Sequence, residues 1–354
     1  MAIADPFTTA LVPLPAQPDG VPWPTAEWPT GDPPPGVGLQ ALLDAAFDDP
    51  DLSQSYAVVV VHRGRLVGER YGGELEHWDR PAEPVTADTR LLSWSTAKSM
   101  LHATVGLLVG DGRLSLDRHP WTDPDDPRSA IILDHLLQMR DGLDFVEDYV
   151  DAGRSDVIEM LFGEGAGDTA AFARNRGLAA PPGTRFNYSS GTTNIVSGVV
   201  AVELGNGYEA FLRERLFDAV GMASATPTFD PAGTWIASSY VHATARDFAR
   251  FGTLYLRDGT WEGRRLLPEG WVDHGRRPRS VDPEDGRLYG AHWWVGGDEH
   301  GCFAALGYDG QSVLVCPGLD LVVVRLGKTP RDRDPHLQSW RAAVVDAFAR
   351  ARTG

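Results

Sequence analysis

The sequence predicts a mixed α/β (α+β) fold, in which an antiparallel sheet flanked by helices is interrupted along the chain by an all-α insert. Two strand-like runs form a hairpin near residue 63, helical segments fill the middle of the chain, and four strand-like runs precede a final helix. Because strands stand on both sides of a helical middle, we expect distant parts of the chain to share one sheet.

The first elements follow from composition and spacing. Residues 1–37 are rich in proline, which blocks helices and strand pairing, so we expect an extended arm. Trp23 and Trp28 indicate that this arm lies against the rest of the protein. Residues 38–48 have helical spacing. The hairpin consists of YAVVVV and RLVGERY, joined by a turn at residues 62–64.

The later elements have the periodicity of helices and then that of strands. Helices are predicted at residues 95–111 (amphipathic), 130–139, 154–163, 192–204, 208–219, 244–257, 268–275 and about 336–351. Strands are predicted at AHWWVGG, CFAAL, SVLVC and LDLVVVRLG, with a turn at Pro317–Gly318 between the last two. We expect three units: the arm (1–37), a discontinuous α/β domain (38–115 and 236–354) and the all-α insert (116–235).

Composition excludes several classes of protein. With 354 residues the chain is long enough for a sizeable core. A formal net charge of −17 disfavours binding to nucleic acid or to an anionic membrane. The sequence has no apolar stretch of about 18 residues, and its first residues lack the pattern of a signal peptide. We therefore expect a soluble, cytoplasmic protein without nucleic-acid or membrane partners, and leave its oligomeric state open.

The missing motifs also narrow the chemistry. No G-x-S-x-G elbow, H-E-x-x-H pair, Cys/His cluster or phosphate-binding glycine loop is present, so we expect neither a metal nor a cofactor. The ten histidines are scattered and are interpreted as structural. Cys302 and Cys316 could form one bridge, but nothing indicates a disulfide framework, and both are interpreted as small core residues on strands.

The first candidate for chemistry is Ser95-Thr96-Ala97-Lys98. Residues i and i+3 of a helix share a face, so Ser95 and Lys98 would be neighbours. In the first turn, the N–H of Ser95 would be unpaired and could donate to a developing oxyanion. A desolvated, neutral lysine could take the serine proton. The pattern also arises by chance, where a serine begins a helix and the lysine is solvated.

Two further observations favour the catalytic interpretation. The residues after Ser95 are strongly apolar, so Lys98 is expected in a crevice and not in solvent. Tyr188 lies in the short polar run FNYSSG before another apolar helix, from which it could reach the same place. Taken alone, Tyr188 could equally be an ordinary half-buried tyrosine.

With these residues the chain resembles the serine β-lactamase-related superfamily, and most of all its 6-aminohexanoate-dimer hydrolase branch. LLSWSTAK (91–98) matches the first motif and FNYSS (186–190) matches the second. The similarity extends over ILDHLLQMRDGLDFVEDYVD, ATARDFARFG and GYDGQSVLVCPGLDLVVVRLG. The resemblance implies a β-lactamase/transpeptidase-like fold, with Ser95 as the nucleophile and Lys98 and Tyr188 as its proton-transfer partners.

The third motif of the family departs from the usual pattern. Relatives have K-T-G or H-x-G on a strand beside the site, whereas the matching triad here is Ala305–Gly307 or, in a shifted register, Tyr308–Gly310. Neither supplies a cation, and Lys328 falls after the next strand. The resemblance implies that this cation binds a substrate carboxylate, so its absence argues against β-lactams and D-Ala-D-Ala. The backbone N–H of Tyr308 would be the second oxyanion donor.

The resemblance also implies substrate-binding residues. Tyr149 occupies the position of a substrate-binding tyrosine, and Ser190 belongs to the second motif. The acidic residues Glu147, Asp148 and Asp151 could attract an amine or could form a solvated loop.

Three further positions are candidates for the same region. Asp309 could attract an amine near the floor of the site, and Trp94 could contact substrate. The pair Trp293–Trp294 could form a wall of the pocket or part of the core. The leading hypothesis is an esterase or amidase for small substrates. The alternatives are a β-lactamase or DD-peptidase, and a catalytically silent binding protein.

Overall fold

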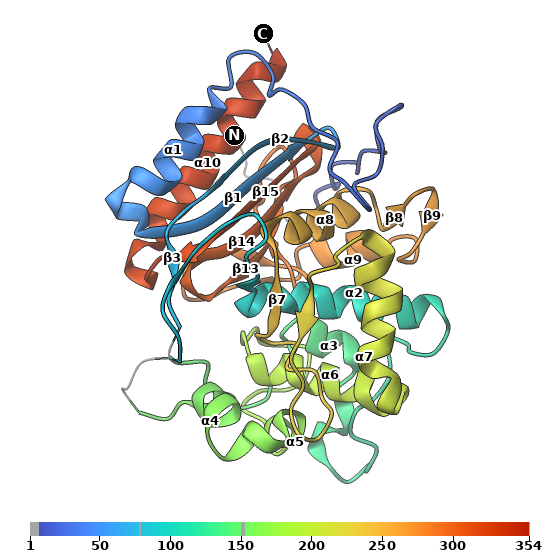
Figure 1. Cartoon of the computed structure of the whole chain (residues 1–354). Helices are drawn as coiled ribbons and strands as arrows, with labels where there is room; N and C mark the ends of the chain where they lie inside the picture. Colours follow the sequence, from blue (N-terminus) through green and yellow to red (C-terminus); the bar gives the residue numbers. More distant parts are fainter. Residues whose placement is uncertain (1–6, 78, 150–152, 354) are drawn as a thin grey trace.

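The computed structural model describes residues 7–77, 79–149 and 153–353, and its centre is one large antiparallel sheet (Figure 1). The strand order of this sheet is β10-β11-β12-β13-β14-β15-β1-β2. Its strands are β10 (Ser280–Val281), β11 (Leu288–Tyr289), β12 (Trp294–Val295), β13 (Phe303–Gly307), β14 (Gln311–Cys316), β15 (Leu321–Lys328), β1 (Gln54–His62) and β2 (Arg65–Tyr71). The hairpin from the first part of the chain therefore pairs with the last strand.

The remaining elements are short sheets and helices. The small sheets are β5 (Leu91–Leu92) with β7 (Val241–Ala243) and β6 (Thr226–Pro227), β3 (Glu74–Leu75) with β4 (Glu83–Pro84), and β8 (Thr260–Trp261) with β9 (Arg264–Arg265). The α-helices are α1 (Leu39–Asp48), α2 (Ala97–Gly110), α3 (Leu133–Leu137), α4 (Asp156–Phe162), α5 (Thr169–Arg174), α6 (Ser190–Leu204), α7 (Tyr208–Phe211), α8 (Ala245–Leu256), α9 (Trp271–Arg276) and α10 (Asp334–Thr353). None of these helices, within the described residues, is long and apolar enough to cross a bilayer.

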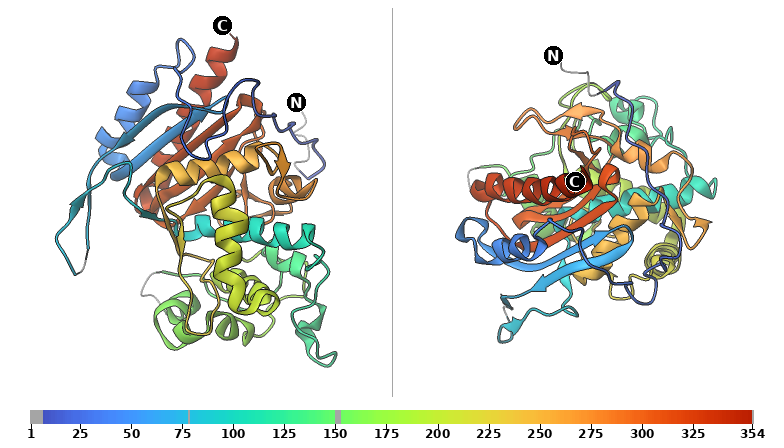
Figure 2. Two further views of the ribbon diagram at one scale, coloured as in Figure 1. Left: turned by 45° about the vertical axis from the view of Figure 1, so that its right-hand side comes forward. Right: turned by 90° about the horizontal axis from the view of Figure 1, so that it is seen from above.

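Both faces of the sheet are covered, as the sequence of β1 requires. Successive strand residues point to opposite faces, and in β1 Val58 and Val60 belong to one apolar cluster while Val59 and Val61 belong to another. Helices α1 and α10 lie side by side on the first face, and α8 lies on the second (Figures 1 and 2). A strand buried on both faces reads as a continuous apolar run, which explains AVVVV.

Helix α2 lies between the sheet and the helical part of the chain formed by α3 to α6 (Figure 1). The sequence predicts an amphipathic helix over 95–111, but every residue of α2 from Ala97 to Leu108 is buried. The helix is present, but the predicted polar face is not, because α2 is covered on all sides and a helix in such a position needs no polar face. The helix also begins two residues late, after a 3₁₀ turn at Trp94–Thr96. The domain boundaries stay a prediction.

The proline-rich arm follows the surface past α8 and β8 (dark blue in Figure 2). Trp23 packs on Trp261 with ring centroids 5.0 Å apart. The buried Arg250 donates to the carbonyl of Pro24 (2.7 Å) and lies over the ring of Trp28. These contacts place the described arm on the α8 side of the sheet.

The sequence left open whether the two cysteines form a bridge, and the structure shows that they do. Cys302 and Cys316 are both buried, and they form a disulfide. The register of the sheet explains the pairing, because β13 and β14 are antiparallel neighbours that align Phe303 with Val315. Cys302 and Cys316 are the next pair along this ladder, although 14 residues of sequence separate them.

Candidate active site

The nucleophile proposed from the sequence stands on a tightly held turn. Ser95 is half-buried within the 3₁₀ turn Trp94–Thr96. The turn is fixed to β7 by two hydrogen bonds, from the N–H of Ser93 to the carbonyl of Val241 (2.8 Å) and from the N–H of Val241 to Ser93 Oγ (3.0 Å). Trp94 has φ 44°, a left-handed conformation that is strained for a tryptophan. Such strain is tolerated where surrounding contacts impose it, and it clusters at functional sites.

Lys98 lies directly beside Ser95. Its side chain is buried, and Lys98 Nζ is 2.9 Å from Ser95 Oγ. Two other atoms surround the amine, the Oγ of Ser190 at 3.1 Å and the carbonyl oxygen of Ser238 at 2.9 Å. Burial lowers the pKa of Lys98 to about 8, and the negative charge of Glu147 opposes this shift. Roughly a tenth of the lysine is therefore neutral at pH 7.

Tyr188 reaches the same serine from the helical part of the chain. It precedes α6, whose N-cap Ser189 accepts from the N–H of Thr192 (2.9 Å). Burial raises the pKa of the Tyr188 hydroxyl, and a hydrogen bond with Ser95 partly offsets the shift. The amine of Lys98 is 4.9 Å from the centroid of the Tyr188 ring. Ser95, Lys98 and Tyr188 thus meet at one point, although 93 positions separate Ser95 from Tyr188.

A carboxylate completes the polar cluster. Glu147 Oε1 accepts from Ser190 Oγ at 2.5 Å and from the Tyr149 hydroxyl at 3.1 Å. Its other oxygen accepts from the N–H of Ser190 at 2.7 Å. The sequence suggested Ser190 as a substrate-binding residue, but its side chain is fully buried and is held by Lys98 and Glu147. Of the other acidic residues of this stretch, Asp148 is half-buried and Asp151 lies outside the described residues.

The backbone of Gly307 approaches that of Ser93 and Ser95 closely, and this contact indicates which three residues form the third motif. A Cβ atom built on Gly307 would be 2.7 Å from the carbonyl oxygen of Ser93 and 3.1 Å from the nitrogen of Ser95. Only glycine fits at such a contact. The triad Ala305–Gly307, at the end of β13, therefore lies beside Ser95, whereas Tyr308–Gly310 forms a 3₁₀ turn beyond the strand.

The residues of that turn have different surroundings. The Tyr308 ring is exposed and stands against Trp94 and Tyr149, with centroids 5.3 and 5.1 Å away. The carboxyl of Asp309 has a pKa raised by burial, and the charges that act on it are those of Lys328 and Arg325. Lys328 ends β15 and pairs with Glu76 at 3.1 Å.

Aromatic side chains surround Ser95. Trp94 and Tyr240 have ring centroids 6.2 Å apart, and Trp94 also contacts Tyr308 edge to face. On the Tyr188 side, Trp294 stacks on that ring at 5.4 Å. Its neighbour Trp293 is fully buried, so only one residue of the tryptophan pair borders the site and the other belongs to the core.

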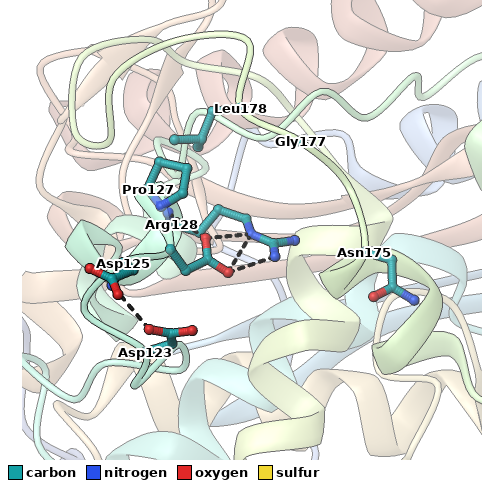
Figure 3. A pocket seen from close by; sticks show the side chains of 8 residues that line it. Asp123, Asp125, Pro127, Arg128, Asn175, Gly177 and Leu178 are labelled. Atoms are coloured by element: carbon teal, nitrogen blue, oxygen red, sulfur yellow. Dashed lines mark hydrogen bonds and ion pairs between the residues drawn. The ribbon is translucent and has the colours of Figure 1, made fainter.

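A separate surface hollow contains none of these residues. It has a volume of about 540 Å³ and is lined by Asp123, Asp125, Asp126, Pro127, Arg128, Asn175, Gly177 and Leu178 (Figure 3). The guanidinium of Arg128 is paired there with Asp126 at 2.6 Å. Nothing in this hollow combines a nucleophile with a base, so the polar cluster at Ser95 is the better candidate for chemistry.

The contacts of two members of the cluster could not be predicted from the sequence. Ser238 contributes only its carbonyl oxygen, which no side-chain pattern can reveal. Glu147 stands in an acidic stretch that is equally compatible with a solvated loop, and only the folded chain shows that it faces Ser190. Its position two residues before Tyr149 was the available signal, since both side chains of a locally extended segment can point the same way.

The sheet with its helices, and a serine beside a buried lysine and a tyrosine, agree with a hydrolase of the serine β-lactamase class. The family model described as Beta-lactamase matches residues 43–347, and the chain belongs to this family. It is 30% identical over 278 residues to the 6-aminohexanoate-dimer hydrolase of Paenarthrobacter ureafaciens, covering 72% of this chain and 69% of that protein. Penicillin-binding protein 4 of Amycolatopsis lactamdurans is 28% identical over 66% of this chain and 62% of its own length.

Solved structures show the same fold. A Bacillus anthracis protein assigned as a 6-aminohexanoate-dimer hydrolase superimposes with a TM-score of 0.76 at 22% identity, covering 98% of this chain and 92% of that one. A penicillin-binding protein homologue from Caulobacter crescentus has a TM-score of 0.68 at 17% identity, covering 89% of this chain and 99% of that one. The predicted β-lactamase/transpeptidase-like fold is confirmed.

Proposed function

We propose that the protein hydrolyses small esters or amides through an acyl-enzyme formed on Ser95. The observation that carries the proposal is the 2.9 Å contact between Ser95 Oγ and the buried amine of Lys98. An amine with a pKa near 8 is a base of suitable strength at neutral pH. Tyr188, hydrogen-bonded to the same serine, supplies a second proton-transfer group.

The proposed reaction has two halves. Ser95 Oγ attacks the carbonyl carbon while its proton passes to neutral Lys98, and the carbonyl oxygen becomes an oxyanion held by the N–H groups of Ser95 and Tyr308. The bond to the leaving group then breaks as Tyr188 protonates that group and regains a proton from Lys98. Water attacks the acyl-enzyme by the reverse relay, which releases the acid and restores the Ser95 hydroxyl.

The surroundings of Ser95 favour substrates without a carboxylate at the reacting end. The triad Ala305–Gly307 provides no cation, and the carboxylate of Glu147 lies within the polar cluster. Aromatic rings at Trp94, Tyr308 and Trp294 offer apolar contact. We propose a linear acyl group, and the similarity to a 6-aminohexanoate-dimer hydrolase supports linear amides as well as esters.

Burst kinetics with p-nitrophenyl acetate and butyrate test this function. The wild type should release close to one equivalent of nitrophenol rapidly, and Ser95→Ala should show no burst. A fluorophosphonate probe should label Ser95 and nothing in the Ser95→Ala variant. Labelling that persists in the variant would contradict the proposal. Turnover of nitrocefin at a higher kcat/KM than any ester or amide would indicate a β-lactamase instead, and ligand binding without turnover a silent binding protein.

A further inference from the structure

The positions of the hydrogen atoms in the polar cluster determine whether the amine of Lys98 can accept a proton from Ser95. As a neutral amine, Lys98 has two N–H donors and one lone pair, and three oxygen atoms surround it. Catalysis requires the lone pair to face Ser95 Oγ. The other two oxygens must then accept hydrogen bonds from Lys98 and must not donate to it. The carbonyl oxygen of Ser238 can only accept, but the hydroxyl of Ser190 could do either.

We propose that Glu147 is a positioning residue that fixes the hydroxyl hydrogen of Ser190 away from Lys98, so that the lone pair of Lys98 is directed at Ser95. A carboxylate has no hydrogen to give, so the 2.5 Å contact between Ser190 Oγ and Glu147 Oε1 requires Ser190 to donate. Ser190 Oγ then offers Lys98 only its own lone pairs. The inference rests on the proposed function of Ser95 and Lys98.

Glu147 is itself held in place by the same cluster. It accepts from the N–H of Ser190 (2.7 Å) and from the hydroxyl of Tyr149 (3.1 Å). Ser190 is fully buried, so its hydroxyl has no solvent partner as an alternative. Two donors from Ser190 and one from Tyr149 thus give this carboxylate a single orientation, and a charge-assisted hydrogen bond of this kind is stronger than one between neutral groups.

The charge of Glu147 provides a second, independent readout. Glu147 raises the pKa of Lys98 against the lowering by burial. The other titratable groups facing Lys98 are Tyr188, whose pKa is raised, and His292, whose pKa burial lowers to about 3. Both are neutral at pH 7, so removing the charge of Glu147 should lower the pKa of Lys98.

The decisive experiment compares Glu147→Gln with wild type over pH 5 to 10. The glutamine amide can donate to Ser190 Oγ and free its hydrogen to occupy the lone pair of Lys98. We expect kcat on the high-pH plateau to fall roughly tenfold or more, KM to change by less than about threefold, and the acid limb to move to lower pH. Asp144→Asn is the matched control, because it removes an exposed carboxylate nearby, paired with Arg154, and should leave kcat, KM and the acid limb unchanged.

A double-mutant cycle separates positioning from mere packing. Ser190→Ala removes the hydroxyl that would misdirect Lys98, so Glu147→Gln/Ser190→Ala should be faster than Glu147→Gln alone. Additive losses, or a plateau kcat in Glu147→Gln within twofold of wild type with an unmoved limb, would overturn the inference. If Glu147→Gln is unstable, Glu147→Asp replaces it and should keep the wild-type limb. Absence of both the burst and Ser95 labelling in the wild type would contradict the proposed function itself.

Discussion

At the scale of single residues, the ionisation of Lys98 should govern the pH dependence of activity. Only the neutral amine can accept the proton of Ser95, and burial lowers the pKa of Lys98 to about 8. We expect kcat/KM for an ester substrate to rise about tenfold per pH unit below pH 8 and to level off above it.

Lys98→Met should lose on the order of 100-fold or more in kcat. Tyr188→Phe should lose a similar factor and keep the limb near pH 8. A flat profile between pH 6 and 9 would exclude Lys98 as the base.

Gly307 should tolerate no side chain. Its backbone is extended (φ −136°), so alanine meets no conformational penalty, but the new Cβ would press on Ser93 and on the nitrogen of Ser95. Because the Ser95 N–H is a proposed oxyanion donor, we expect Gly307→Ala to lower kcat on the order of 100-fold. Gly207→Ala, at a position with open space around it, is the control and should be silent in burst assays and thermal melts. Equal activity of the two variants would contradict the close approach.

The residue scale is also where sequence reasoning succeeded and failed most clearly. The proximity of Ser95, Lys98 and Tyr188 could be predicted because each lies in a short motif, and their catalytic roles stay predictions. The direction of the hydrogen bond made by the Ser190 hydroxyl could not be predicted, because it depends on Glu147, which lies 43 positions away in the sequence. Motifs name atoms that react, whereas the hydrogen bonds that orient them arise only from tertiary contacts.

At the scale of elements, the turn that carries Tyr308 depends on a buried arginine. Arg325, on β15, is fully buried and donates to the carbonyl oxygens of Asp309 (3.3 Å) and Gln54 (3.1 Å) and to Thr329 Oγ1 (2.7 Å). Burial lowers its pKa to about 9. A lysine has one ammonium group and cannot span these acceptors. With lysine in place of Arg325, the turn and the strand ends around it should therefore lose the hydrogen bonds that connect them.

We expect Arg325→Lys to lower the free energy of unfolding by about 2–4 kcal/mol, because several buried carbonyls lose their donors. It should also reduce kcat, because Tyr308 would no longer be held beside Ser95. Urea denaturation and burst kinetics measure the two effects. Arg331→Lys, on the surface and paired with Glu284, serves as the control. A variant with wild-type stability and kcat would show that the turn is held by other contacts.

Elements were predictable in proportion to their length and periodicity. The long strands β1 and β15 and the helices α6, α8 and α10 were expected from their patterns and are present. The predicted helix at 208–219 is instead α7 followed by a π turn at Leu212–Phe217 and a 3₁₀ turn at Asp218–Val220. Hydrogen-bond spacing within a helix leaves no mark on hydrophobic periodicity, so the sequence could not distinguish these forms.

At the scale of the whole molecule, a chain of polar groups links the helical part to the body. His274, on α9, bonds through one ring nitrogen to Asp134 of α3 (2.8 Å) and through the other to His102 of α2 (3.1 Å). His102 continues the chain to the hydroxyl of Tyr255 on α8 (2.8 Å). Burial lowers the pKa of His102, with His274 and His292 acting in the same direction.

The buried histidines His102 and His292, together with Asp134, should make the stability of the protein sensitive to acid. His102 and His292 have folded pKa values below the unfolded value of about 6.5, so the unfolded state binds more protons as pH falls below it. Burial raises the pKa of Asp134, but hydrogen bonds from His274 and Gln138 outweigh it, and the net lowering also favours folding at neutral pH. Because the folded pKa of His292 is about 3, lowering the pH from 6.5 to 5 should cost about 2 kcal/mol at this histidine, and His102 should act in the same direction. Denaturant titrations at pH 7.5 and 5.0 measure the difference, and equal free energies of unfolding would contradict it.

The order of strands and helices sufficed to predict the sheet and its helical interruption, but not the full width of the sheet. β12 lies within the predicted run AHWWVGG, but β10 and β11 have two residues each, too few for an alternating pattern. The disulfide between Cys302 and Cys316 stayed an open possibility for a related reason, because it depends on the register of β13 and β14, which spacing in the sequence does not specify.

The arm has a consequence for how the chain folds during synthesis. Its Pro24 carbonyl binds Arg250, a partner 226 positions later, and Trp23 packs on Trp261. At 5–20 residues per second, a ribosome needs roughly 10–45 s to add the residues between them. Residues 29–31 can pair with Leu66 of β2 early in synthesis, but throughout that interval Trp23 and Pro24 have no partner on α8 or β8. This part of the arm is thus made before every strand of the large sheet and is among the last to dock.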